Sequence, residues 1–264
     1  MRYVAVFLVT IALAALHAFA ADSPLTVSAA ISLKESFTRI GGAFEAQSGQ
    51  KVEFNFGATG HLLAQIREGA PVDAFVSASD EQMDQAEKQG LVDATTRAVI
   101  AGNEMVLVVP RDSKLELRTF DELASAAVKK LAVGQPKIVP AGEYAMQVLH
   151  HLKLDPVVAD RIVYGSSVRQ VLDYVARGEI DAGIVYATDA QEAGAEVKLL
   201  VRSESSWHDP IHYVGAVVKS SKHAEQTKRF IDFVRSDSAQ KILATAGFTP
   251  AAQAAASTTQ PATR

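Results

Sequence analysis

Short β-type runs alternate with amphipathic stretches along most of this chain, and this alternation restricts the fold more than any other feature. The run 25–29 has the apolar content of a strand, and the apolar residues of 32–47 recur on one face of a helix. The same order returns at 52–56 and 59–68, at 73–78 and 80–88, and again beyond residue 130. Such alternation is typical of an α/β fold with largely parallel strands.

Two strongly β-type runs, 105–109 and 211–218, suggest how the chain is divided. A chain that leaves one α/β lobe through the first run and returns through the second forms two lobes joined by a two-strand hinge. We therefore expect lobe I at 24–103 and 216–249, and lobe II at 104–215. One continuous doubly wound sheet remains the alternative, because periodicity alone does not prove the crossing.

Both ends of the sequence differ from the middle. Arg2, the apolar run 4–16 and the small residues of Ala18-Phe19-Ala20 are typical of an export signal, so we expect residues 1–20 to be cleaved. An uncleaved anchor is the alternative, although the run is short for a membrane span. Residues 250–264 lack bulky apolar side chains, so a disordered tail is expected there. A last helix is expected at 224–246.

Composition limits the possible partners. Apolar residues make up 48% of the chain and charged residues 21%, values typical of a globular protein with a real core. The formal net charge of −4, without basic clusters, argues against nucleic-acid binding. The chain has no cysteine, so neither a disulfide nor a lipid-modified Cys is available. We expect a soluble, exported, monomeric protein that does not insert into the membrane.

Four segments place small or hydroxyl-bearing residues where helices are expected to begin, without Lys or Arg at those tips. They are Ala30-Ile31-Ser32-Leu33, Gly57-Ala58-Thr59-Gly60, Val139-Pro140-Ala141-Gly142-Glu143-Tyr144 and Gly165-Ser166-Ser167-Val168. A helix start has unpaired N–H groups and about half a positive charge, which favours an anion. Ligands of α/β folds bind where strands end and helices begin. If these starts converge, they form an oxyanion site.

Enzyme functions have weaker support in the sequence. An exported hydrolase needs a nucleophile beside a base, but no G-x-S-x-G motif and no Cys are present. The histidine groupings are His150-His151 and His208-x-x-x-His212, without an H-E-x-x-H motif. We therefore expect a binding protein that has no catalytic residues and needs no cofactor.

Six motifs, in order and spaced across 25–248, resemble the periplasmic molybdate-binding proteins of ABC transporters. They are Ala29-Ala30-Ile31-Ser32-Leu33, Gly57-Ala58-Thr59-Gly60, Gly69-Ala70-Pro71-Val72-Asp73, Val139-Pro140-Ala141-Gly142-Glu143-Tyr144-Ala145, Val168-Arg169 and Gly183-Ile184-Val185-Tyr186. The resemblance implies a type II periplasmic binding protein fold, with two lobes, a two-strand hinge and a ligand cleft between the lobes.

The resemblance also implies a ligand set. Ser32 and Thr59 of lobe I would offer hydroxyl and backbone N–H groups, Ala141 and Val168 of lobe II backbone N–H groups, and Tyr186 its phenol. Molybdenum would be held only as its oxyanion, without direct protein–metal bonds. Ser32 and Thr59 have an alternative role as helix N-caps, and Tyr186 as a core aromatic residue with a satisfied hydroxyl.

By the same resemblance, the protein would capture molybdate, and tungstate, in the periplasm and deliver it to the membrane permease of an ABC transporter. Sulfate, thiosulfate or another oxyanion is the alternative ligand. The chain has no G-x-x-x-x-G-K-[ST] phosphate loop, so ATP hydrolysis is expected in other subunits.

Overall fold

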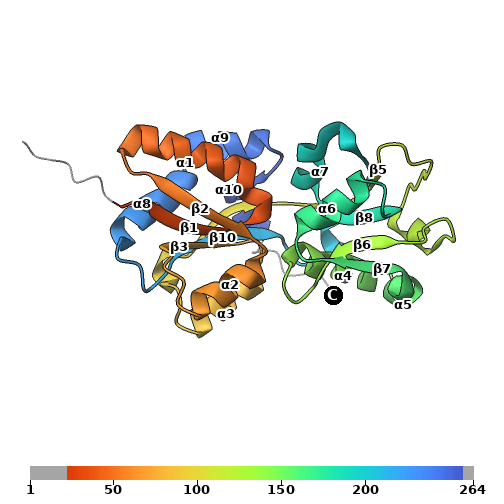
Figure 1. Ribbon diagram of the computed structural model, residues 1–264, viewed down its shortest axis with the longest axis horizontal. Coiled ribbons are helices and arrows are strands. Elements are labelled where there is room, and N and C mark those ends of the chain that lie inside the picture. Colours follow the sequence, from red (N-terminus) through yellow and green to blue (C-terminus); the bar gives the residue numbers. More distant parts are fainter. Residues whose placement is uncertain (1–22, 258–264) are drawn as a thin grey trace, which may run out of the picture.

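The computed structural model describes residues 23–257, which form two lobes with one β-sheet each (Figure 1). The expected export signal at 1–20 lies outside the described residues, as do positions 258–264 of the expected tail. Because the strands form two separate sheets, the alternative of one continuous sheet is wrong. Within residues 23–257, no helix combines the length and apolar character that a membrane crossing needs.

The first lobe contains a six-stranded sheet in the order β11-β4-β10-β3-β1-β2. Strands β1 to β3 are parallel, whereas β10 runs antiparallel to β3 and β4, and β11 antiparallel to β4. The strands are β1 (Leu25–Ala30), β2 (Val52–Gly57), β3 (Ala74–Ser77), β4 (Ala98–Gly102), β10 (His212–Val217) and β11 (Thr249–Pro250).

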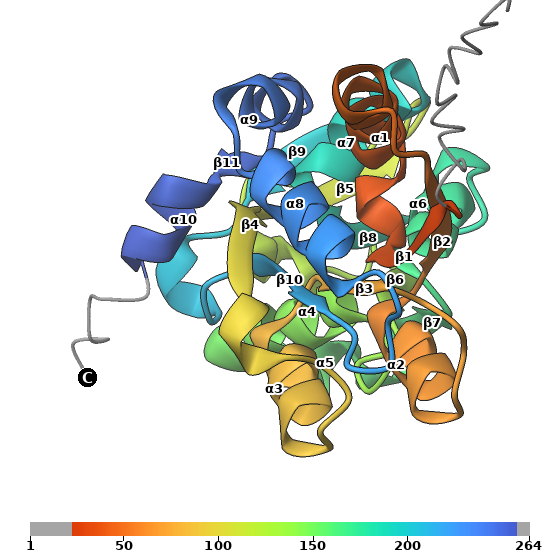
Figure 2. The same cartoon turned by 90° about the vertical axis from the view of Figure 1, so that its left-hand side faces the viewer.

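Helices cover both faces of this sheet (Figure 2). In Figure 1, α1 and α9 lie on one side of it and α2 and α3 on the other. The helices are η1 (Ile31–Leu33), α1 (Lys34–Ser48), α2 (Thr59–Arg67), α3 (Asp80–Lys88), η2 (Ala94–Thr96), α8 (Ala224–Val234), α9 (Asp237–Thr245) and α10 (Ala251–Ser257). Phe37 of α1 and Phe230 of α8 pack edge to face in the buried core beside β2.

The second lobe contains a five-stranded sheet in the order β7-β6-β8-β5-β9. Strands β6, β7 and β8 are parallel, and β5 is antiparallel to β8 and β9. Its strands are β5 (Met105–Pro110), β6 (Leu131–Gly134), β7 (Ile162–Gly165), β8 (Ala182–Tyr186) and β9 (Val197–Arg202). Its helices are η3 (Phe120–Ala124), α4 (Pro140–His151), α5 (Asp155–Val158), η4 (Ala159–Arg161), α6 (Val168–Ala176), α7 (Ala187–Ala193), η5 (Gly194–Glu196) and η6 (Ser205–Trp207).

The chain crosses between the lobes twice. The first crossing, from β4 to β5, consists of Asn103 and Glu104. The second connects β9 to β10 and ends at His212, which already pairs with Gly102 in the first sheet. Residues 212–215 therefore belong to lobe I, and the expected assignment of 104–215 to lobe II is wrong at that end.

The C-terminal segment also differs from the expectation. Residues 249–257 form β11 and α10 rather than a disordered tail, and Pro250 pairs with Ala101 of β4. Ala254 is buried against Gly102. A Cβ added to Gly102 would lie only 3.1 Å from the Cβ of Ala254. Small side chains are thus enough to pack this helix, because the glycine permits a close approach.

The expected last helix at 224–246 is divided into α8 and α9. Ser236 has an extended backbone conformation, and its side chain accepts a hydrogen bond from the Ala239 N–H at 3.5 Å. Ser is a preferred N-cap residue. The hydroxyl therefore begins a new helix at Asp237, which the apolar periodicity alone did not predict.

Candidate functional site

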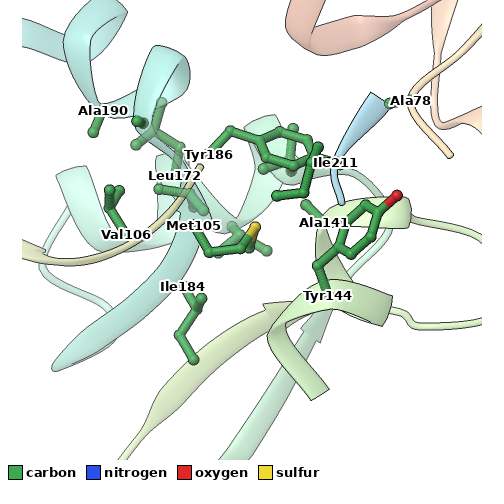
Figure 3. Close-up of a cluster of buried hydrophobic side chains, with 14 of the residues drawn as sticks. Ala78, Met105, Val106, Ala141, Tyr144, Leu172, Ile184, Tyr186, Ala190 and Ile211 are labelled. Carbon is green, nitrogen blue, oxygen red and sulfur yellow. The ribbon is translucent and has the colours of Figure 1, made fainter. Parts of the chain in front are cut away.

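The ends of parallel strands in both lobes meet at one cavity. The turns after β1 and β2 approach it from the first lobe, and the turns after β6 and β7 and the end of β8 approach it from the second. All five residues of the predicted ligand set line it. The lining consists of Ala30, Ile31, Ser32, Gly57, Ala58, Thr59, Ala78, Val139, Pro140, Ala141, Val168 and Tyr186. In Figure 3, the Tyr186 side chain extends toward the side where Ala141 and Ala78 lie.

Backbone N–H groups at three helix starts contribute donors to the site. Thr59 is the first residue of α2, Val168 the first of α6, and Ala141 the second of α4. The N–H groups of a first helical turn have no acceptor within their own helix. Pro140 fits the first position of α4 because a proline there removes no intrahelical hydrogen bond. The three helices therefore present N–H groups and the positive ends of their dipoles to the cavity.

The two hydroxyl side chains do not act as N-caps. Ser32 Oγ pairs with the Tyr213 hydroxyl at 2.8 Å, and Thr59 Oγ1 accepts a hydrogen bond from the Ala78 N–H at 3.3 Å. The N-cap positions of α1 and α2 belong to Leu33 and Ala58 and have no side-chain cap. The alternative that these two residues merely cap helices is therefore wrong.

The phenol of Tyr186 is buried at the cavity. Its oxygen has no hydrogen-bond partner among the described residues, although the side chain is only 1% exposed. Burial raises the pKa of this phenol well above its usual value, so it remains protonated and able to donate. An unpaired buried hydroxyl is unfavourable. A ligand oxygen in the cavity would satisfy it, whereas the alternative of a core aromatic with a satisfied hydroxyl does not fit.

No residue in the cavity lining listed above has a charged side chain. Arg169 follows Val168, but its guanidinium forms ion pairs of 2.7 Å with buried Asp189 and with Glu35. Its charge is therefore balanced by two carboxylates. The cavity volume of about 10 Å³ is on the order of one water molecule, so the closed cavity has no room for a sugar or a peptide.

The lobes touch each other beside the cavity. The Gly60 N–H of α2 donates to the Ile138 carbonyl of the second lobe at 2.9 Å. The Arg169–Glu35 ion pair likewise joins α6 to α1. The structure is therefore a closed form, in which donors from both lobes surround the same small volume.

The histidine groupings do not form a metal site in the described part of the chain. No cluster of three or more His, Cys, Asp or Glu side chains suited to a metal occurs within residues 23–257. His208 pairs with Ser203, whereas His212 pairs with Asp80 of α3. His150 is exposed and pairs with Asp155.

Sequence reasoning missed the residues behind the lining. Tyr213 of β10 contacts Ser32, and Asn103 of the first crossing contacts Tyr213 in turn. Ala78, itself in the lining, donates to Thr59. The one hint in the sequence to these supporting residues was Asn103, a polar residue between two apolar strands. Its partners lie 85 and 110 residues away in the sequence, so no local pattern could identify them.

The model of a family described as bacterial extracellular solute-binding protein matches residues 25–249. The chain belongs to this family. Among curated members, the molybdate-binding protein ModA of Haemophilus influenzae is 34% identical, and the match covers 87% of this chain and 91% of ModA. The predicted family resemblance is thereby confirmed.

Solved structures of solute-binding proteins have the same fold. The periplasmic molybdate-binding protein of Azotobacter vinelandii is 26% identical with a TM-score of 0.77, over 85% of this chain and 98% of that one. The sulfate-binding protein SubI of Mycobacterium tuberculosis is 21% identical with a TM-score of 0.76, over 90% and 92% of the two chains, which shows the fold alone. These matches confirm the predicted two-lobed α/β class.

Proposed function

We propose that this solute-binding protein captures molybdate, and tungstate with similar affinity, and delivers it to the membrane permease of an ABC transporter. The observation that supports this most is the cavity lining, which offers hydrogen-bond donors from both lobes and contains no charged side chain. The 34% sequence identity to the ModA of Haemophilus influenzae, over most of both chains, adds independent support.

Such a lining fits a fully deprotonated tetrahedral dianion, because each of its oxygens is an acceptor. Hydrogen phosphate carries a proton that needs an acceptor, and leaving it unpaired costs about 1–3 kcal/mol. That mismatch corresponds to roughly ten- to a hundredfold weaker binding. Tungstate is nearly the same size as molybdate, so the same donors should hold both ions. Sulfate is smaller, and its rejection depends on the cavity radius.

Calorimetric titration of the ion-free protein with molybdate, tungstate, sulfate and hydrogen phosphate tests the proposal. Tight one-to-one binding of molybdate and tungstate alone is the expected result. Tight binding of sulfate would instead identify sulfate as the ligand, and no binding of any of the four ions would mean that the family shares only its fold with this chain.

Hydroxyl-deletion variants test the site itself. Ser32→Ala and Thr59→Ala should each weaken molybdate binding roughly ten- to a hundredfold, because a hydrogen bond to a charged group contributes about 1.5–3 kcal/mol. Thr38→Ala is the matched control. It removes an exposed hydroxyl of the first lobe that bonds only its own helix at Lys34, so affinity should not change.

The proposed role needs neither a cofactor nor catalysis. A two-lobed receptor with donors on both sides closes around its ion, as hinge-bending proteins do. The permease would recognise the closed form, and ATP would be hydrolysed by other subunits. We further propose that the protein acts as a soluble monomer in the periplasm after removal of its export signal. Size-exclusion chromatography and N-terminal sequencing of the exported protein test these points.

A further inference from the structure

A chain of hydrogen bonds runs behind the cavity and ends at Ser32. Tyr213 of β10 is fully buried, and its hydroxyl lies 2.8 Å from Ser32 Oγ and 3.2 Å from Asn103 Nδ2. Asn103 is in the first crossing between the lobes, and its Nδ2 also donates to Thr188 Oγ1 at 2.9 Å. Four side chains thereby connect the site to both lobes.

The donors and acceptors of this hydrogen-bonded series can be assigned in one way that leaves each buried group paired. Asn103 Oδ1 accepts a hydrogen bond from the Glu104 N–H at 2.9 Å, so the amide group of Asn103 is oriented with Nδ2 toward Thr188 and Tyr213. The Tyr213 oxygen therefore accepts from Asn103. Its own hydrogen must donate to Ser32 Oγ, because an amide NH₂ cannot accept and an unpaired buried donor is unfavourable.

We infer that Tyr213, oriented by Asn103, is a positioning residue that makes the Ser32 hydroxyl a hydrogen donor toward the ligand. A lone pair of Ser32 Oγ is taken by Tyr213, so the Ser32 hydrogen remains for the cavity that this residue lines. Thr59 is arranged in the same way, since its Oγ1 accepts from the Ala78 N–H. The hydroxyls thus present hydrogens rather than lone pairs.

This inference rests on the proposed function and deepens it, because it concerns how a protonated oxyanion is rejected. A hydroxyl that is free to rotate can turn a lone pair toward the proton of a ligand and accept it. While Tyr213 donates to one lone pair of Ser32, turning the other lone pair to the ligand would leave the Ser32 hydrogen without an acceptor, which is unfavourable. The selectivity against hydrogen oxyanions should therefore depend on Tyr213, which lies outside the cavity lining.

Selenate and hydrogen arsenate provide a matched pair of probes at mildly alkaline pH. Both are tetrahedral dianions of nearly the same size, but only hydrogen arsenate carries a proton. Wild type should bind selenate roughly ten- to a hundredfold more tightly than hydrogen arsenate. Tyr213→Phe keeps the ring and removes the hydroxyl, so this ratio should fall at least severalfold. An unchanged ratio would overturn the inference.

Tyr144→Phe is the control for loss of a buried phenol beside the site. Tyr144 lies on α4 and is buried, which raises the pKa of its phenol, and the hydroxyl that opposes this rise is that of Ser79 rather than that of Ser32 or Thr59. This variant should leave the selenate-to-arsenate ratio unchanged, even if it weakens both ions equally. An equal fall in the ratio for both tyrosine variants would assign the effect to general loosening and overturn the specific role of Tyr213.

The free energy of unfolding of the ion-free protein tests this inference independently of the proposed function. Ser32→Ala removes the acceptor of the Tyr213 hydrogen, so it should destabilise the wild-type background more than the Tyr213→Phe background. Additive effects in this double-mutant cycle would overturn the coupling between Ser32 and Tyr213 on which the inference depends, whether or not molybdate binds. Failure of wild type to bind molybdate or tungstate, with a non-additive cycle, would overturn the proposed function alone.

Discussion

Replacing Val168 with proline should remove one ligand donor and leave the fold intact. Val168 is the first residue of α6, the helical position where proline is best tolerated. Ser167 before it has φ −155° and ψ 163°, within the extended region that a residue preceding proline adopts. The Ser167 hydroxyl would still cap the helix by accepting from the Gln170 N–H. Only the N–H group at the cavity is lost.

The expected magnitude follows from the charge of the ligand. A hydrogen bond to a charged group contributes about 1.5–3 kcal/mol, so Val168→Pro should weaken molybdate binding roughly ten- to a hundredfold. Val168→Ala is the matched control, because it removes more of the buried side chain but keeps the N–H. It should lower the melting temperature while changing affinity far less than the proline variant.

Calorimetric titration of both variants with molybdate, after circular dichroism has shown the helix content to be retained, measures this effect. The reasoning is refuted if the folded proline variant binds molybdate as tightly as Val168→Ala. That result would mean that the N–H of Val168 does not contact the ion. A weaker affinity in the alanine variant than in the proline variant would assign the effect to side-chain packing instead.

Three further changes probe the closed form and the C-terminal segment. Gly60→Ala would place a Cβ 2.9 Å from the Ile138 backbone of the other lobe, so overpacking of about 1–3 kcal/mol should weaken molybdate binding roughly five- to a hundredfold. Its ion-free melting temperature should not fall, since alanine favours a helix over glycine; unchanged affinity would contradict the contact. Glu35→Gln breaks the partly exposed ion pair with Arg169, so the affinity for molybdate should fall by less than roughly tenfold and should depend less on salt. Titrations at two salt concentrations measure this dependence. Equal salt dependence in wild type and variant would refute a role of the ion pair in closure. Deletion of 251–264 uncovers β4 and should lower the melting temperature by at least about 2 °C in a thermal scan, whereas an unchanged value would show that α10 adds no stability.

Much of the architecture could be predicted because it depends on local patterns. Strand–helix alternation predicted the α/β class, and small residues at helix starts predicted which segments converge. The family resemblance implied the five positions that now line one cavity. Their contact with an ion remains a prediction. Long-range pairings were beyond such patterns: Ser32 meets Tyr213 across 181 residues. The disorder predicted from composition was wrong for residues 250–257, because burial there depends on the close approach that Gly102 permits rather than on the segment's own side chains.

The two crossings differ in length, and this difference has a mechanical consequence. Only Asn103 and Glu104 connect β4 to β5, whereas the return from β9 to β10 is longer. When two bodies swing about a short tether, atoms at the tether move least. Asn103 lies in that tether and bonds to Tyr213. Ser32 should therefore stay oriented in the first lobe even when the lobes are apart, so this part of the binding site is already formed when the ion arrives.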